Sequence, residues 1–183
     1  GWKEHELKYY QKFFNSVELN TSFYHLPKKE TFRNWRKLVP KDFIFAVKAS
    51  RYLTHILKLS EPREPLKNLL ENASVLKEKL GPIFFQFPPN FTADSEKLAK
   101  FARILRESPR GSNPPKRNTE GWTLPNQGTP PARRFAFEFR HKSWFAPKIY
   151  KILKEHNLAL ILSDTPEYPY KEEITADFVY LRL

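Results

Sequence analysis

Acidic and basic side chains in this sequence stand beside aromatic runs, in patterns that could support acid–base chemistry or the binding of an anion. The clearest case is the segment 134–144, RFAFEFRHKSW, where three phenylalanines alternate with Ala136, Glu138 and Arg140. Alternation with period two and no Gly or Pro predicts a β-strand. One side of this strand is aromatic, and the other carries an acid and a base two residues apart.

Other predicted strands place polar residues in the same way, near their C-terminal ends. The strand-end residues are Glu18, Asn20, Lys48, Gln86, Glu138, Arg140, Asp164 and Arg182, and those in the loops just beyond are Arg51, His55, His141 and Trp144. Buried charges are tolerated only when they are paired or hydrogen-bonded. Repetition at one end of several strands is typical of a parallel barrel that builds a site.

The residue types suggest two chemistries. Glu18 and Glu138 could form an acid–base pair, with Lys48 or Arg140 keeping one carboxylate ionised while burial raises the pKa of the other. The same Lys48 and Arg140 could instead clamp a carboxylate or phosphate. The predicted catalytic residues are Glu18, Glu138, Lys48 and Asp164, and the predicted ligand-binding residues are Asn20, Arg51, His55, Gln86, Arg140, Trp144 and Arg182.

Other sites are less favoured by the sequence. Only His55 and His141 lie near the acids, so no metal site is expected, and no phosphate-binding loop, dinucleotide fingerprint or nucleophile elbow occurs, so no cofactor is expected. Trp144 and Tyr24 could present flat faces to a sugar or base, although such aromatics more often belong to a core. The polar cluster could also be purely structural, a network of salt bridges that closes the barrel mouth.

Composition narrows the class of protein. The net charge of +12 could favour phosphates, nucleic acid or acidic surfaces, so nucleic-acid binding stays an alternative, although the scattered lysines are also typical of helix faces that serve solubility. No apolar run is long enough for a membrane span, and no membrane partner is expected. The absence of Cys is compatible with a reducing compartment, and we expect a cytoplasmic location. The absence of Met predicts a fragment or trimmed chain, and the oligomeric state is left open.

Strands and helices are predicted to alternate along the chain. Strands are expected at 16–23, 42–49, 82–87, 134–140, 158–164 and 177–183, and helices at 6–14, 31–38, 66–80, 94–105 and 144–156, with Thr31 and Asp94 as N-caps and Gly81 as a C-cap. This alternation predicts a parallel α/β sheet, but periodicity does not distinguish a doubly wound sheet from a β/α-barrel. Residues 107–133 hold six prolines and three glycines, which predicts a flexible insertion or a gene-model artefact.

Several long motifs resemble one family. They are the segments 14–24, 45–55, 80–89 and 135–144, together with Ser163-Asp164. In this order they resemble the YecE-like family, also called domain of unknown function 72. The resemblance implies an α/β fold, a parallel (β/α)8 barrel of the triose-phosphate-isomerase type, without an established activity. It also implies that residues 1–183 form one partial barrel domain with about six strands, lacking the first and last.

The expected function follows from the position of the polar residues at the C-terminal ends of the predicted strands. In such barrels the C-terminal strand ends and the loops beyond them carry the site. We expect a protein that binds, or acts by acid–base chemistry on, a small polar or anionic ligand, phosphorylated ligands included, at the barrel mouth. The alternatives are a nucleic-acid-binding or processing protein that uses the same mouth, and a non-catalytic interaction scaffold. Whether the protein is an enzyme is left open, because this barrel hosts many chemistries.

Overall fold

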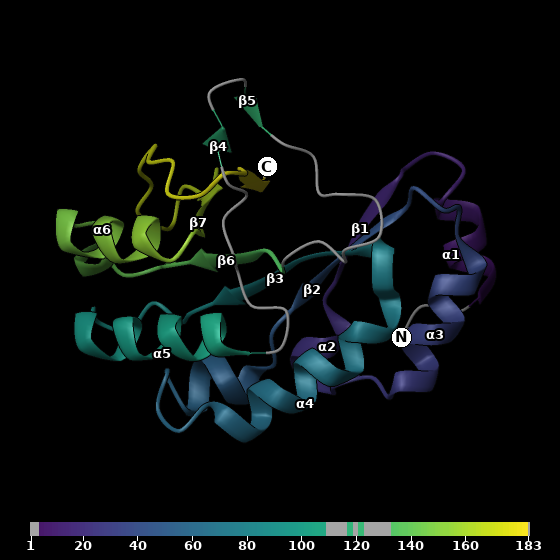
Figure 1. The fold of residues 1–183 in the computed structure, drawn as a ribbon, viewed down its shortest axis with the longest axis horizontal. Coiled ribbons are helices and arrows are strands. Elements are labelled where there is room, and N and C mark those ends of the chain that lie inside the picture. Colours follow the sequence, from purple (N-terminus) through teal and green to yellow (C-terminus); the bar gives the residue numbers. More distant parts are fainter. Residues whose placement is uncertain (1–3, 109–116, 119–120, 123–132, 183) are drawn as a thin grey trace.

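A computed structural model describes residues 4–108, 117–118, 121–122 and 133–182. Its main sheet has six strands, all parallel to their neighbours, in the order β1-β2-β3-β6-β7-β8 (Figure 1). The strands are β1 Ser16–Leu19, β2 Ile44–Lys48, β3 Leu80–Gln86, β6 Phe135–Glu138, β7 Leu158–Ser163 and β8 Tyr180–Arg182. β4 Arg117–Asn118 and β5 Gly121–Trp122 form a separate antiparallel pair.

Helices follow most strands. The α-helices are α1 Glu4–Tyr10, α2 Thr21–Tyr24, α3 Lys29–Leu38, α4 Arg63–Ala73, α5 Ser95–Glu107 and α6 Pro147–Glu155, and the shorter turns are a π-helix at Tyr52–Ile56 and 3-10 helices at Ser74–Lys79 and Lys142–Trp144. The strand order follows the sequence without reversal. A doubly wound sheet reverses its strand order, so the barrel-type winding is the one present.

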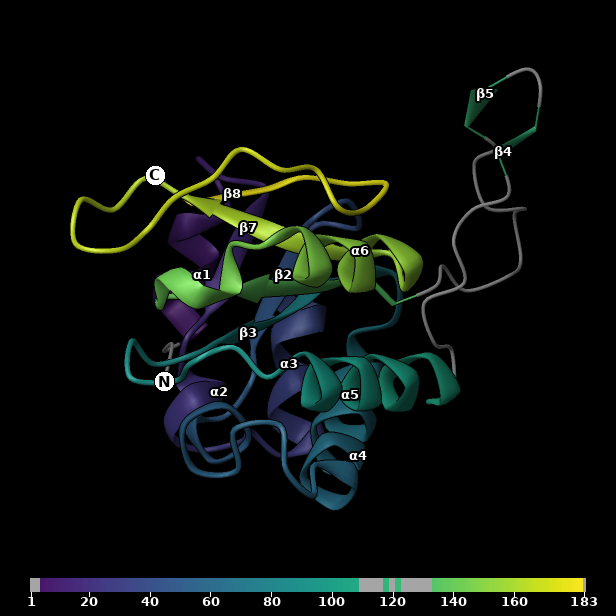
Figure 2. The same cartoon turned by 90° about the vertical axis from the view of Figure 1, so that its left-hand side faces the viewer.

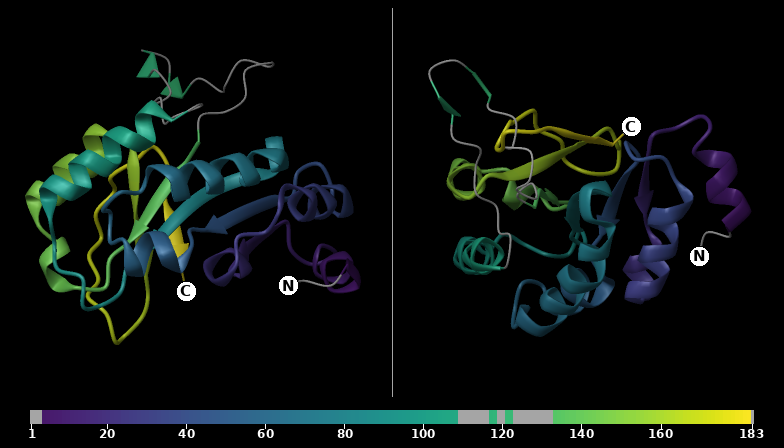
Figure 3. Two further views of the ribbon diagram at one scale, coloured as in Figure 1. Left: turned by 90° about the horizontal axis from the view of Figure 1, so that it is seen from below. Right: turned by 45° about the vertical axis from the view of Figure 1, so that its right-hand side comes forward.

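The sheet is curled into a half-barrel. Arg182 on the last strand lies 3.1 Å from Glu18 on the first, measured from Nη2 to Oε1. Strands about 4.8 Å apart would put the edges of a flat six-stranded sheet about 24 Å from each other, which two side chains cannot span. Figure 3 shows this curvature from two sides.

The two faces of the sheet have different chemistry. The convex face carries residues such as Phe45, Phe85 and Phe137, which join the buried residues of α3, α4, α5 and α6 in one apolar core. Figure 2 shows the ribbons of these helices beside the sheet. The concave face carries a small cluster of Phe84, Ala136, Ala159 and Ile161. Beyond this cluster, toward the C-terminal strand ends, the concave face is polar.

Two N-terminal predictions are corrected by the structure. The strand predicted at 16–23 ends at Leu19, and residues 21–24 turn into α2. The Ser22 hydroxyl lies 2.9 Å from the carbonyl oxygen of Leu19 and 2.6 Å from that of Lys48, so its one O–H can donate to the end of either strand. Thr31 is not an N-cap, because α3 begins at Lys29 and the extended residue before it is Lys28.

The predicted helix at 66–80 is also corrected. α4 starts at Arg63 and stops at Ala73, and a 3-10 segment with Lys77 at φ 53° leads into β3. Gly81 is therefore a strand residue. A Cβ there would lie 2.5 Å from Cγ2 of Ile44, so glycine is needed where β3 passes β2.

Of three further predictions, one is confirmed, one is corrected, and one falls mostly outside the described residues. Asp94 caps α5 as predicted, accepting a hydrogen bond from the amide of Lys97 at 2.9 Å. The helix predicted at 144–156 begins later, at Pro147, whose fixed φ suits the first helical position. Apart from Glu107, Ser108, Arg133 and the β4–β5 strands, the predicted insertion at 107–133 lies outside the described residues. Within the described residues, no helix has the length and apolar character needed to cross a membrane.

Candidate functional site

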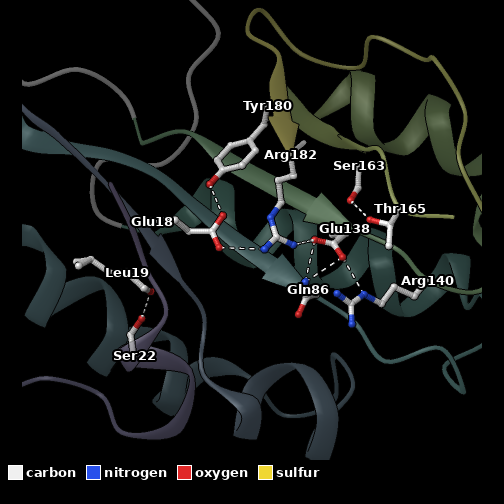
Figure 4. A network of polar contacts seen from close by, with 10 residues as sticks. All are labelled: Glu18, Leu19, Ser22, Gln86, Glu138, Arg140, Ser163, Thr165, Tyr180 and Arg182. Atoms are coloured by element: carbon white, nitrogen blue, oxygen red, sulfur yellow. Dashed lines mark hydrogen bonds and ion pairs between the residues drawn. The ribbon is translucent and has the colours of Figure 1, made fainter. Parts of the chain in front are cut away.

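Glu138 is the centre of the polar network on the concave face (Figure 4). It ends β6, and its side chain is 3% exposed. Its neighbour in register is Gln86, whose Nε2 lies 2.9 Å from each carboxylate oxygen. Arg140 donates from Nε at 2.8 Å, and Arg182 donates from Nη1. The period-two pattern of the 134–140 segment thus places Glu138 and Arg140 on one face, as predicted.

The network continues to the opposite edge of the sheet. Arg182 contacts Glu138 through one nitrogen and Glu18 through the other. Glu18 also accepts a hydrogen bond of 3.0 Å from the hydroxyl of Tyr180. Arg182 and Tyr180 share a face because they lie two residues apart on β8. Both carboxylates are therefore held by side chains from distant parts of the chain.

Electrostatics keep Glu138 ionised. Burial alone would raise the pKa of Glu138, but the hydrogen bond from Gln86 and the positive charges of Arg182 and Arg140 outweigh burial and lower it. Burial and the nearby carboxylate of Glu18 raise the pKa of Tyr180, so its hydroxyl stays a donor. An ionised Glu138 whose oxygens already accept hydrogen bonds is suited to orienting the two arginines. It is poorly suited to acting as a general acid or base.

Lys48 has a different environment. It ends β2 on the concave face and is 9% exposed. Its Nζ lies 4.6 Å from the ring centre of Phe23 and 5.9 Å from that of Phe84. Among the residues that the structure describes, none accepts a hydrogen bond from this nitrogen. Burial, followed by the charge of Arg182, lowers the pKa of Lys48, and the two acids only partly oppose this.

The loop after β2 brings a histidine to the same end of the sheet. The π-helix Tyr52–Ile56 carries His55, whose ring meets the ring of Phe23 edge-on at 5.2 Å. His55 Nδ1 lies 2.9 Å from the hydroxyl oxygen of Thr54. Burial, together with the charge of Arg51 and other cations, lowers the pKa of His55, so the neutral imidazole is the form present at pH 7. The loop also holds Leu59 at φ 70°.

The structure does not bring every predicted residue into this network. It unites Glu18, Gln86, Glu138, Arg140 and Arg182, and places Lys48 and His55 beside them. The side chains of Asn20, Arg51 and Asp164 are exposed. Asp164 only continues the β7–β8 pairing, with its amide donating to the carbonyl of Arg182 at 2.9 Å.

Trp144 is corrected more strongly, whereas His141 is a hydrogen-bonded loop residue. Trp144 is 1% exposed, stacks on Phe139 at 4.3 Å and donates its indole N–H to the carbonyl of Phe91 at 2.6 Å. It belongs to the core on the convex side and offers no face to a ligand. His141 accepts a hydrogen bond from the amide of Ser143 and caps the short 3-10 turn.

Sequence reasoning missed several members of the site. Tyr180 was not predicted, although its spacing of two from Arg182 on a predicted strand was a usable signal. Phe84, whose ring lies near the Lys48 amine, had the same signal, because it lies two residues before Gln86 on a predicted strand. Phe23, which also lies against that amine, and Tyr168, whose ring lies 4.4 Å from the Arg140 guanidinium, had no such signal. Within the described ranges, no group of three or more His, Asp or Glu side chains is placed to hold a metal ion.

Solved structures share this architecture. A DUF72 family protein from Thermotoga maritima MSB8 is 27% identical and has a TM-score of 0.72, covering 97% of this chain and 64% of that one. A DUF72 family protein from Enterococcus faecalis V583 is 22% identical, also with a TM-score of 0.72, covering 96% and 62%. The curled six-stranded parallel half-barrel is thus a fold found in DUF72 structures.

Sequence comparison agrees. The family model described as "Protein of unknown function DUF72" matches residues 2–183, and the chain belongs to this family, as its motifs predicted. UPF0759 protein YunF of Bacillus subtilis is 28% identical over 169 residues, covering 82% of this chain and 52% of YunF. UPF0759 protein YecE of Escherichia coli K12 is 33% identical over 85 residues, covering 46% and 31%. The chain therefore spans about half the length of YunF.

Proposed function

We propose that this protein binds a small anionic ligand, a carboxylate or a phosphate, on the polar part of its concave face, and that this face is the mouth of a complete (β/α)8 barrel in the whole protein. The location supports the proposal, because ligands of such barrels bind at the C-terminal ends of the strands. Glu138, Lys48 and Gln86 all stand at that end of their strands.

The observation that carries the proposal is the amine of Lys48, which belongs to a residue that is 9% exposed and has no hydrogen-bond acceptor among the described residues. The nitrogen itself keeps contact with solvent, so a ligand can reach it. An anionic group on a ligand would supply the missing acceptor. The charges around it point the same way, since three cations, Lys48, Arg140 and Arg182, surround two carboxylates.

Arg140 adds directional donors for such a ligand. Only its Nε–H is used in a hydrogen bond with the described residues, and a guanidinium has five N–H donors in a rigid fork. Glu138 on one side and the ring of Tyr168 on the other hold the group in place. A positioned guanidinium loses little entropy on binding, which favours planar anions such as carboxylate and phosphate.

The site also supports acid–base chemistry as part of this proposal. Glu138 is held ionised and acts as a positioning residue. Among the bases of the site, the pKa of Lys48 is lowered from 10.5, toward neutral pH. General bases work best when their pKa lies near the working pH. We therefore assign proton transfer to Lys48.

A titration with inorganic phosphate tests the proposal. Saturable binding by calorimetry is expected for the wild type, with a loss of about tenfold or more in affinity for Lys48→Met and for Arg140→Ala, because each removes a charged contact worth about 1.5–3 kcal/mol. Lys151→Met is the matched control, since that lysine is 77% exposed and lies on α6. It should bind phosphate as the wild type does.

Equal binding by all four proteins, or no binding at all, would contradict the proposal. The same titration with a short oligonucleotide separates the nucleic-acid alternative. In that case affinity would fall steeply with salt, by about 10³–10⁵ between 50 and 200 mM for a protein that makes 6–10 phosphate contacts. A protein that binds neither probe would favour the interaction scaffold.

A further inference from the structure

The Lys48 amine has the surroundings of a nucleophile as well as those of an anion-binding group. Two phenylalanine rings, Phe23 and Phe84, lie against it. The guanidinium carbon of Arg182 lies 5.7 Å from the same Phe84 ring. A lysine becomes reactive when it is desolvated in an apolar pocket beside another cation.

Compared with an exposed lysine, the surroundings of Lys48 shift the equilibrium between ammonium and neutral amine toward the neutral amine. A ring face stabilises an ammonium, but only modestly. Partial removal of the ammonium from water opposes this by disfavouring the charged form. The contacts with the two rings therefore offset only part of the desolvation cost of the Lys48 ammonium. The positive charge of Arg182 disfavours the ammonium further by repulsion. The lowered pKa of Lys48 agrees with this balance.

We propose that Lys48 forms a Schiff base with an aldehyde or ketone that carries a carboxylate or phosphate group. This inference rests on the proposed anion site, because Arg140 and Arg182 would bind the charged end of the compound while its carbonyl meets the amine. Lys48 is suited to this role because it ends a strand, its amine lies over the rings of Phe23 and Phe84, and the guanidinium of Arg182 lies over the same Phe84 ring.

The step is balanced without any co-reactant. Nζ of the neutral amine attacks the carbonyl carbon, a C–N bond forms, and the π electrons move to the oxygen, which takes a proton. The nitrogen lone pair then forms C=N as the C–O bond breaks. The oxygen leaves as water with one hydrogen from the amine and one proton from the solvent, so the nitrogen keeps its second hydrogen and the product is the protonated imine. The protonated imine draws electrons from the adjacent carbon, which is the use that enzymes make of lysine Schiff bases.

The closing experiment uses glyoxylate, an aldehyde with a carboxylate, together with cyanoborohydride, which reduces an imine to a stable secondary amine. Peptide mass mapping of the whole chain then follows carboxymethylation at each lysine over time. Lys48 should be labelled about tenfold faster than the exposed Lys151, because burial and the charge of Arg182 favour the neutral, nucleophilic form of its amine.

Two controls make the result specific. Added phosphate should slow labelling at Lys48 and leave Lys151 unchanged, and acetaldehyde, which lacks the charge, should label Lys48 with a smaller preference. Lys48→Arg keeps a positive charge but forms no imine, so it should bind phosphate and lose the fast label. The wild-type map needs no variant, so a variant that fails to fold does not remove the test.

The outcomes separate the two proposals. Labelling of Lys48 no faster than Lys151, in a protein that binds phosphate, would overturn the Schiff-base inference and leave the anion site standing. Fast labelling without phosphate binding or phosphate protection would overturn the anion site and the charged part of the substrate. Absence of both would overturn the two together.

Discussion

Neutralising Glu138 tests how the polar network contributes to stability. Glu138→Gln keeps the shape of the side chain but replaces one acceptor oxygen with an NH₂ donor. Gln86, Arg140 and Arg182 all donate to the present carboxylate, so the new amide would face donors that it cannot satisfy. The change therefore removes the charge and creates unpaired donors in a site that is 3% exposed.

The expected cost can be worked out from the same contacts. Breaking a buried ion pair costs about 3–5 kcal/mol. Arg140 and Arg182 are 23% and 27% exposed, so each can turn partly to water, which places the loss near the lower limit, at about 3 kcal/mol. With a urea m-value of about 2 kcal/mol/M, the unfolding midpoint should fall by about 1.5 M.

Urea unfolding followed by circular dichroism measures this loss, with Glu78→Gln as the matched control. Glu78 also pairs with an arginine, Arg36, at 2.8 Å, but it is 43% exposed. Its neutralisation should cost less than about 1 kcal/mol. A Glu138→Gln protein as stable as the control variant, or more stable than the wild type, would refute the reasoning. That outcome would mean that the charge is held at the expense of stability, as functional charges often are.

Four other perturbations have defined expectations. Lys48→Met should stabilise the fold at pH 7 by about 1 kcal/mol, because an apolar side chain of similar size replaces a poorly paired buried charge, and a less stable variant in thermal unfolding would contradict this. The pKa of Lys48 is lowered from 10.5 in the folded protein, so between the folded and unfolded pKa values the unfolded chain binds more protons. The stability of the wild type therefore rises with pH in that range, and the greater stability of Lys48→Met should shrink there. The pKa of Glu138 is lowered from 4.5, so the stabilisation by its carboxylate is fully present above about pH 4.5 and is lost as the pH falls through the pKa of the folded protein. Glu138→Gln should therefore lose less stability on acidification than the wild type. Tyr180→Phe should cost about 1 kcal/mol in urea unfolding, since it removes the donor to a partly solvated Glu18, and an unchanged midpoint would exclude that contribution. Gly81→Ala should cost about 2 kcal/mol, because its Cβ meets Ile44 on the neighbouring strand, and combining it with Ile44→Ala should cost less than the sum of the two single changes.

Local pattern was enough to predict many features of the chain. Period two along 134–140 places Glu138 and Arg140 opposite the phenylalanines, and the structure has them so. Asp94 was recognisable as a cap because an N-cap depends only on residues within one turn of it. Where tertiary contacts intervene, the local pattern misled. The strand after Ser16 stops early because Ser22 bonds to the carbonyl of Lys48, far along the chain.

The sequence by itself determined the α/β alternation, the family, and the side of each strand on which its polar residues lie, because these depend on side chains a few residues apart. Only the tertiary structure decided the order of the strands and the curl that brings Glu18 to Arg182, 164 residues later. It also decided that Trp144 is core and that Lys48 lies between two rings without an acceptor among the described residues. Periodicity states which way a side chain points, but which distant side chain it meets depends on how the strands assemble.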